Sequence, residues 1–140
     1  MNRIKIKIPI YNCTCHVLIG DEIEKTINNY VKRYKWPIEN YIEPGKEVHG
    51  YVPDIDDIEN YYIFYNKDSL TINIIAHEIS HVVENIFNEK DIEANGEARS
   101  YLTGYITESI VDYVIKKDLF INKYLKKKEL INQNSGDENQ

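Results

Sequence analysis

The sequence predicts a single α+β domain, in which a small, twisted, mostly antiparallel sheet packs on one helix and on a long C-terminal helix. Residues 3–11 alternate apolar side chains with charged or polar ones, which is typical of a half-buried strand. Residues 69–88 and 92–119 instead repeat apolar side chains every three or four positions, which is typical of amphipathic helices. A chain of 140 residues is long enough for one compact core. We expect this domain to cover residues 1–125.

The N-terminal part is expected to form a hairpin followed by a helix. A second short strand covers His16 to Ile19 and ends at Gly20. Asp21 is predicted to cap the next helix, because Glu24 three positions later completes a pair that resembles a capping box. This helix ends before Pro37. Its apolar face contains Ile23, Ile27, Tyr30, Val31 and Tyr34.

The middle of the chain, residues 38–69, is expected to contain two further strands. Glu47 to Val52 and Asn60 to Asn66 are apolar stretches on either side of an acidic turn. The second stretch contains a run of aromatic side chains, which pack well on a pleated surface.

The C-terminal half is expected to be helical. Ser69 is predicted to cap a helix that runs to about Asn88, and a long second helix runs from about Ile92 to Leu119. Residues 126–140 have no apolar period and are expected to form a charged, disordered tail.

Composition and charge exclude several classes of partner. A net charge of −6 argues against nucleic acid as the main partner, because binding of phosphates requires clustered Lys and Arg. No segment approaches the roughly 20 apolar residues of a membrane-spanning helix, so no membrane partner is expected. Residues 1–8 lack the unbroken apolar run of a secretory signal, which predicts a cytoplasmic location with Cys13 and Cys15 reduced. The sequence does not indicate an oligomeric state.

The motif that points to chemistry is His77-Glu78-Ile79-Ser80-His81, inside the first predicted helix of the C-terminal half. Residues four apart share a helix face, so the two imidazoles can meet one zinc ion at about 2.0–2.1 Å. Glu78 lies roughly 100° further round the helix, where it can reach a water on the metal rather than the metal itself. The motif therefore predicts a zinc site with two histidine ligands and a general base.

A hydrolytic zinc site also needs a third protein ligand, and three glutamates compete for this role. Glu84 is on the histidine face but a turn beyond His81, so its carboxylate is expected to overshoot the metal. Glu97 lies early in the next helix, and antiparallel packing of the two helices would bring it back toward the histidines. Glu93, one turn earlier on the same side, stays open as an alternative. We expect Glu97 to be the ligand.

The sequence resembles the short zincin-like metallopeptidases of phage and bacterial genomes in two segments, His77-Glu78-x-x-His81 and, after it, Glu97-Ala98-x-x-Tyr101-Leu102-x-Gly104-Tyr105. These metallopeptidases are related in pattern to gluzincin and ImmA/IrrE-type families. The resemblance is firmest over about residues 70–115. It implies a zincin-like fold, a Zn²⁺ cofactor bound by His77, His81 and Glu97, and Glu78 as catalytic base. It also implies a peptide or protein substrate, and the host cytoplasm as location if the chain is phage-encoded. Only fifteen residues separate His81 from Glu97, fewer than in many gluzincins.

The expected function is hydrolysis of peptide bonds by a zinc-activated water, with Glu78 moving the proton from water to the leaving amine. Tyr101 is expected to donate a hydrogen bond to the oxyanion, with Tyr105, Arg99 and His49 as further candidates. The alternative functions are a catalytically silent zinc-binding or regulatory protein of the same fold, and a metal-free structural protein with a chance motif.

A second metal site at Cys13-Thr14-Cys15-His16 is the other possibility that the sequence offers. The spacing of the cysteines fits structural zinc poorly, because such pairs usually have two to four residues between them. We expect these cysteines to be small apolar side chains instead.

Overall fold

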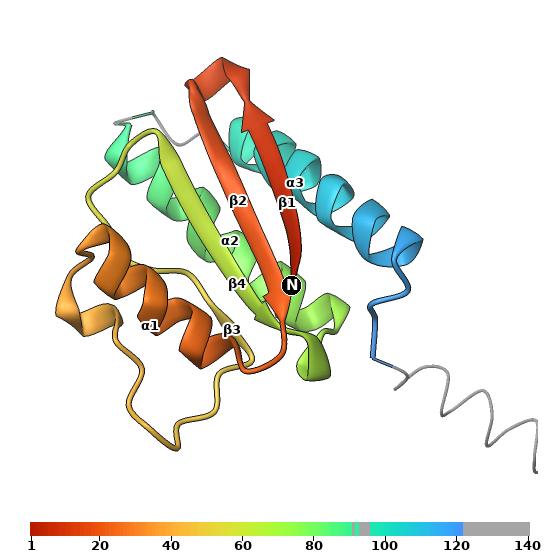
Figure 1. The fold of residues 1–140 in the computed structure, drawn as a ribbon. Coiled ribbons are helices and arrows are strands. Elements are labelled where there is room, and N and C mark those ends of the chain that lie inside the picture. Colours follow the sequence, from red (N-terminus) through yellow and green to blue (C-terminus); the bar gives the residue numbers. More distant parts are fainter. Residues whose placement is uncertain (91, 93–95, 122–140) are drawn as a thin grey trace, which may run out of the picture.

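The computed structural model describes residues 1–90, 92 and 96–121, and it has a four-stranded sheet with helices on both faces (Figure 1). The strands are β1 (Asn2–Ile8), β2 (Cys13–Gly20), β3 (Gly50–Tyr51) and β4 (Asn60–Asn66). The helices are α1 (Ile23–Tyr34), α2 (Ile72–Glu89) and α3 (Gly96–Lys116), with 3-10 turns η1 (Pro9–Tyr11), η2 (Ile38–Asn40) and η3 (Lys67–Ser69). The predicted α+β class is confirmed. The expected tail, residues 126–140, lies outside the described residues.

The sheet is mixed rather than mostly antiparallel. Its order is β1-β2-β4-β3, with antiparallel outer pairs β1–β2 and β3–β4 and a parallel central pair β2–β4. The central pair is parallel because α1 and the segment after it carry the chain from the end of β2 back to the start of β4. This order makes β1 and β3 the opposite edges of the sheet.

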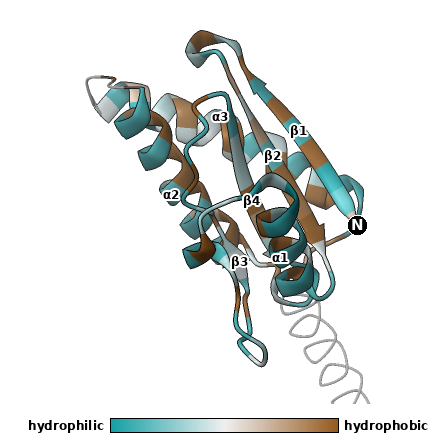
Figure 2. Cartoon of the chain, turned by 60° about the vertical axis from the view of Figure 1, so that its left-hand side comes forward, coloured by the Kyte–Doolittle hydropathy of each residue, from teal (hydrophilic) through white to brown (hydrophobic). Residues whose placement is uncertain are grey.

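The two faces of the sheet bury different side chains, because successive residues of a strand point to opposite faces. On β4, Tyr61, Ile63 and Tyr65 pack in a large core with α2 and α3, whereas Phe64 packs in a smaller core with α1. Figure 2 shows hydrophobic colour along much of β2 and alternating colours along the edge strand β1. The helices α2 and α3 thus cover one face and α1 covers the other.

Both predicted helix caps are wrong. Glu22, in a left-handed conformation, precedes α1, and no side chain caps that helix, so Asp21 is not its cap. Thr71 caps α2 in place of Ser69, since its hydroxyl accepts a hydrogen bond from the Ile74 N–H at 3.2 Å.

Several element boundaries also differ from the predictions. β1 ends at Ile8 because Pro9 begins η1 and cannot donate to the ladder. β2 is longer than predicted, whereas β3 has two residues in place of the expected six between Glu47 and Val52. Among residues 1–90, 92 and 96–121, no helix combines the length and apolar character that crossing a membrane requires.

Candidate metal centre

The helix α2 positions the histidines because its apolar side is fixed on the sheet. The Tyr65 hydroxyl of β4 donates to the carbonyl oxygen of Ile75 at 2.9 Å inside the core. The opposite side of α2 leaves His77 and His81 exposed. The residues that bury the apolar side are Ile75, Ile79, Val82, Val83, Ile86 and Phe87.

The two histidines are close enough to share one metal ion. Their Nε2 atoms are 3.2 Å apart, and their ring centroids are separated by 4.8 Å. Two nitrogen ligands at about 2.0–2.1 Å from a tetrahedral zinc ion lie about 3.3–3.4 Å from each other. The observed separation of the two nitrogen atoms is therefore close to that of two ligands of one zinc ion.

Glu78 lies beside this pair but points into the protein. It is 7% exposed and is in contact with the backbone of Gly50 on β3. Burial raises the pKa of the Glu78 carboxyl above its ordinary value, although the nearby His77 and His81 oppose the shift. A carboxyl with a raised pKa beside a candidate metal site is typical of a proton-transfer group.

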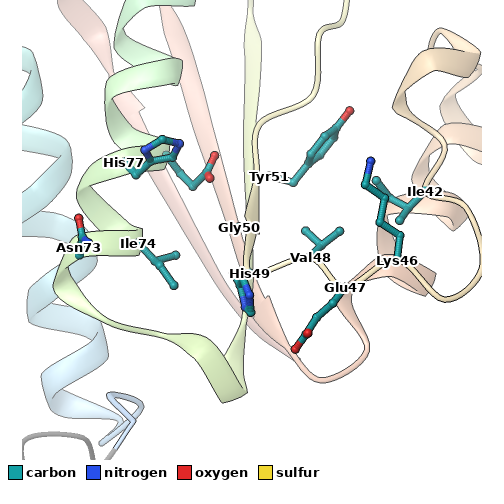
Figure 3. A pocket seen from close by; sticks show the side chains of 11 residues that line it. Ile42, Lys46, Glu47, Val48, His49, Gly50, Tyr51, Asn73, Ile74 and His77 are labelled. Carbon is teal, nitrogen blue, oxygen red and sulfur yellow. The ribbon is translucent and has the colours of Figure 1, made fainter.

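A cavity of about 480 Å³ opens between α2 and the segment that leads into β3, and His77 and Glu78 both line it. Figure 3 shows His77 and Ile74 of α2 on one side of the cavity, with Val48 and Tyr51 on the other. The exposed surface of the cavity wall as a whole is mostly apolar. Its polar side chains include Lys46, His49 and Asn73.

None of the glutamates that the structure describes is grouped with the histidines as a third ligand. Within the described residues, no three or more His, Cys, Asp or Glu side chains are grouped so that they could hold a metal ion. Glu97 is exposed in the first turn of α3, where the guanidinium of Arg99 lies 5.4 Å from the ring centre of Phe87. Phe87 is six residues beyond His81, about 9 Å along the helix axis. Glu97 as a zinc ligand therefore stays a prediction.

The sequence offers two other glutamates as candidates for the third ligand. Glu84 is exposed on α2, one turn after His81. Glu93 lies outside the described residues.

Among the candidate oxyanion donors, His49 is the one that lines the cavity. Its Nδ1 is 2.7 Å from the Ser69 hydroxyl oxygen. The Tyr105 hydroxyl donates to the carbonyl oxygen of Lys7 at 2.9 Å, at the sheet edge opposite β3. Tyr101 is 69% exposed one turn earlier on the same side of α3, so the structure does not bring it to the cavity. Its catalytic role stays a prediction.

The cysteines do not form a metal site with His16. Cys13 and Cys15 are free thiols buried in the core beneath α2 and α3, where burial raises the pKa of both. The His16 ring lies on the other face of β2, with its Nε2 2.8 Å from the side-chain oxygen of Asn60. Both cysteines were expected to serve as small apolar side chains, and their burial in the core agrees with that expectation.

Sequence reasoning missed Gly50, which lines the cavity and lies against Glu78. It belongs to no motif, so the sequence contains no local signal for this role. Comparisons with protein-family models, curated proteins and solved structures found no match to this chain. Function must therefore be inferred from the site itself.

Proposed function

We propose that this protein is a zinc-dependent metallopeptidase in which His77 and His81 bind the metal and Glu78 is the general base. The observation that carries the proposal is the Nε2–Nε2 distance of 3.2 Å, which is suited to two ligands of one zinc ion. The buried carboxyl of Glu78 beside the pair, with its raised pKa, supports an acid–base role.

The third ligand that we propose is Glu97, on the basis of the resemblance to zincin-like metallopeptidases. A hydrolytic zinc centre takes three protein ligands and leaves one position open for water or substrate. Binding by Glu97 requires the first turn of α3 to move toward the histidines. Glu93 is the alternative, and it lies outside the described residues.

In this mechanism, bound zinc supplies a Lewis acid that lowers the pKa of water to about 7 and polarises a carbonyl group. Glu78 accepts the proton of the attacking water and holds it on its carboxyl group. It then donates that proton to the leaving amine, so the same carboxylate is base and acid in one turnover. The low exposure of Glu78 supports this role, because bulk water has limited access to the proton that it holds.

The edge strand β3 offers a place for an extended substrate. The His49 carbonyl accepts from the Asn66 N–H at 2.9 Å, so the backbone of His49 faces β4. Alternation along the strand then turns the N–H and C=O of Gly50 toward the free edge. A peptide that adds to this edge gains main-chain hydrogen bonds beside Glu78, which supports a peptide as the substrate class.

The decisive experiment compares the wild type with Glu78→Gln. We expect the variant to bind one zinc ion as the wild type does, and to hydrolyse peptides about 100- to 10,000-fold more slowly, because the general base is lost. Glu108→Gln is the control, since Glu108 is an exposed glutamate on α3. Hydrolysis that survives Glu78→Gln would exclude this mechanism. Stoichiometric zinc without cleavage of any peptide would instead support the catalytically silent zinc-binding protein.

A further inference from the structure

Asn40 is a buried asparagine whose side chain uses all of its hydrogen-bonding capacity. It is 2% exposed and lies in η2, after α1. Its Nδ2 donates to the carbonyl oxygens of Pro37 at 3.1 Å and Asp54 at 2.9 Å. Its Oδ1 accepts from the Tyr51 hydroxyl at 2.7 Å and from the Asp54 N–H at 3.0 Å. An asparagine side chain has two donor hydrogens and two acceptor lone pairs, so none is left unpaired.

Three of these four bonds go to the segment that begins with β3. The strand itself pairs with β4 only through Gly50 opposite Tyr65 and Tyr51 opposite Phe64. A ladder this short is below the usual length of strands and contributes little to holding the segment in place. Asn40 therefore links Tyr51 and Asp54 to the layer of α1 and η2 by three hydrogen bonds.

The place of β3 matters because Gly50 touches the candidate base. A Cβ atom at Gly50 would lie 2.7 Å from Cγ of Glu78, so the strand backbone is packed directly on that side chain. A shift of β3 would change both the cover over Glu78 and the free edge beside it.

We propose that Asn40 is a positioning residue, which holds β3 against Glu78 through Tyr51 and Asp54 and so keeps the substrate edge in place. The inference rests on the proposed function, because a peptide on the free edge of β3 is the substrate that it concerns. Asn40 does not touch the reacting atoms in this scheme.

The test uses two variants of this network and one matched control. Asn40→Ala removes all four bonds, whereas Tyr51→Phe removes only the 2.7 Å bond and keeps the ring. Asn60→Ala is the control, because Asn60 is also a partly buried asparagine with side-chain hydrogen bonds, to His16 and Asp57. It lies at the start of β4, whereas β3 pairs with the end of that strand.

Two readouts separate positioning from general stability. We expect Asn40→Ala to raise KM for a peptide about tenfold with kcat changed less than about threefold, because substrate binding is lost rather than chemistry. We also expect amide hydrogen exchange of residues 50–54 to accelerate in Asn40→Ala, and to a smaller extent in Tyr51→Phe, with the exchange of α3 unchanged. Zinc affinity should stay at the wild-type value in both. Asn60→Ala should leave KM and the exchange of residues 50–54 unaltered.

The outcomes distinguish this inference from the function on which it rests. Wild-type KM and exchange in both network variants would overturn the positioning role, as would an equal KM rise in Asn60→Ala. If the wild type cleaves no peptide, the proposed function fails, and amide exchange alone decides whether Asn40 positions β3. Faster exchange at residues 50–54 without a change of KM in an active enzyme would also overturn the inference.

Discussion

Gly50 and Glu78 are in contact across the wall of the cavity, and the contact leaves no room for a side chain at position 50. An ideal Cβ atom on Gly50 would lie 2.7 Å from Cγ and 3.0 Å from Oε1 of Glu78. Glycine is required here by this close approach of the backbone to the carboxylate. The two residues are 28 positions apart in the sequence, so only the fold brings them together.

We therefore expect Gly50→Ala to damage the site by pushing Glu78 out of its place. Overpacking of this kind costs about 1–3 kcal/mol in the free energy of unfolding. Misplacement of the base by about 1 Å is expected to lower kcat/KM about 100-fold in an active enzyme. Urea denaturation and peptide hydrolysis measure the two effects separately.

Gly104→Ala is the matched control, because nothing lies within 4 Å of a Cβ atom added at that position on α3. We expect it to stabilise the protein by about 0.5–1 kcal/mol, because alanine has the higher helix propensity. Activity should not change. If Gly50→Ala and Gly104→Ala changed the free energy of unfolding and the activity equally, Gly50 would not be constrained by Glu78.

The parts of this structure that the sequence predicts well are local. The helical period predicts that the buried side of α2 consists of Ile72, Ile75, Ala76, Ile79, Val82, Val83 and Ile86. The structure confirms five of these, but Ile72 and Ala76 are exposed. The same helical period brings the two Nε2 atoms of His77 and His81 within 3.2 Å of each other. Such features depend on a single helix, so the order of residues is sufficient to predict them.

The parts that were not predicted depend on contacts between distant segments. The parallel pairing of β2 with β4 follows from the path of α1 across the sheet, which no short pattern records. Ser69 resembles a helix cap in sequence, yet its hydroxyl lies 2.7 Å from His49 Nδ1, and Thr71 is the cap. The third zinc ligand depends on the relative placement of α2 and α3, which the spacing of residues between them does not determine.

Zinc should stabilise the protein through the histidine pair. A ligand that binds only the folded state at about 100 times its Kd adds about 2.7 kcal/mol to the free energy of unfolding. We expect this rise in thermal denaturation of the wild type with zinc, and its loss in His81→Ala. Glu97→Gln should weaken zinc binding and Glu84→Gln should not, if Glu97 is the third ligand. The reverse result would assign that role to Glu84.

The buried carboxyl of Glu78 should make the metal-free protein less stable as the pH rises. Its folded-state pKa is raised by burial, so its stabilising contribution is complete below the ordinary glutamate pKa and is lost as the pH rises through the folded-state value. Glu78→Gln removes this loss, because the amide stays neutral. After chelation of metal, the variant should therefore gain stability relative to the wild type as the pH rises above the ordinary glutamate pKa of about 4.3. For the exposed control Glu108→Gln, we expect the difference in free energy of unfolding from the wild type to be the same at every pH. The same pH-independent difference in Glu78→Gln would contradict the prediction.

The docking of α2 on the sheet should depend on the buried hydroxyl of Tyr65. This hydroxyl and that of Tyr105 both donate to a backbone carbonyl at 2.9 Å, but Tyr65 is 0% exposed and Tyr105 is 40% exposed. We expect Tyr65→Phe to lower the free energy of unfolding by about 1 kcal/mol, because water cannot replace a partner in the core. Tyr105→Phe should change it by less than about 0.5 kcal/mol, because solvent can hydrate the freed carbonyl of Lys7. Chemical denaturation of both variants measures the difference. Equal costs would mean that the hydrogen bond to Ile75 does not hold the histidine helix in place.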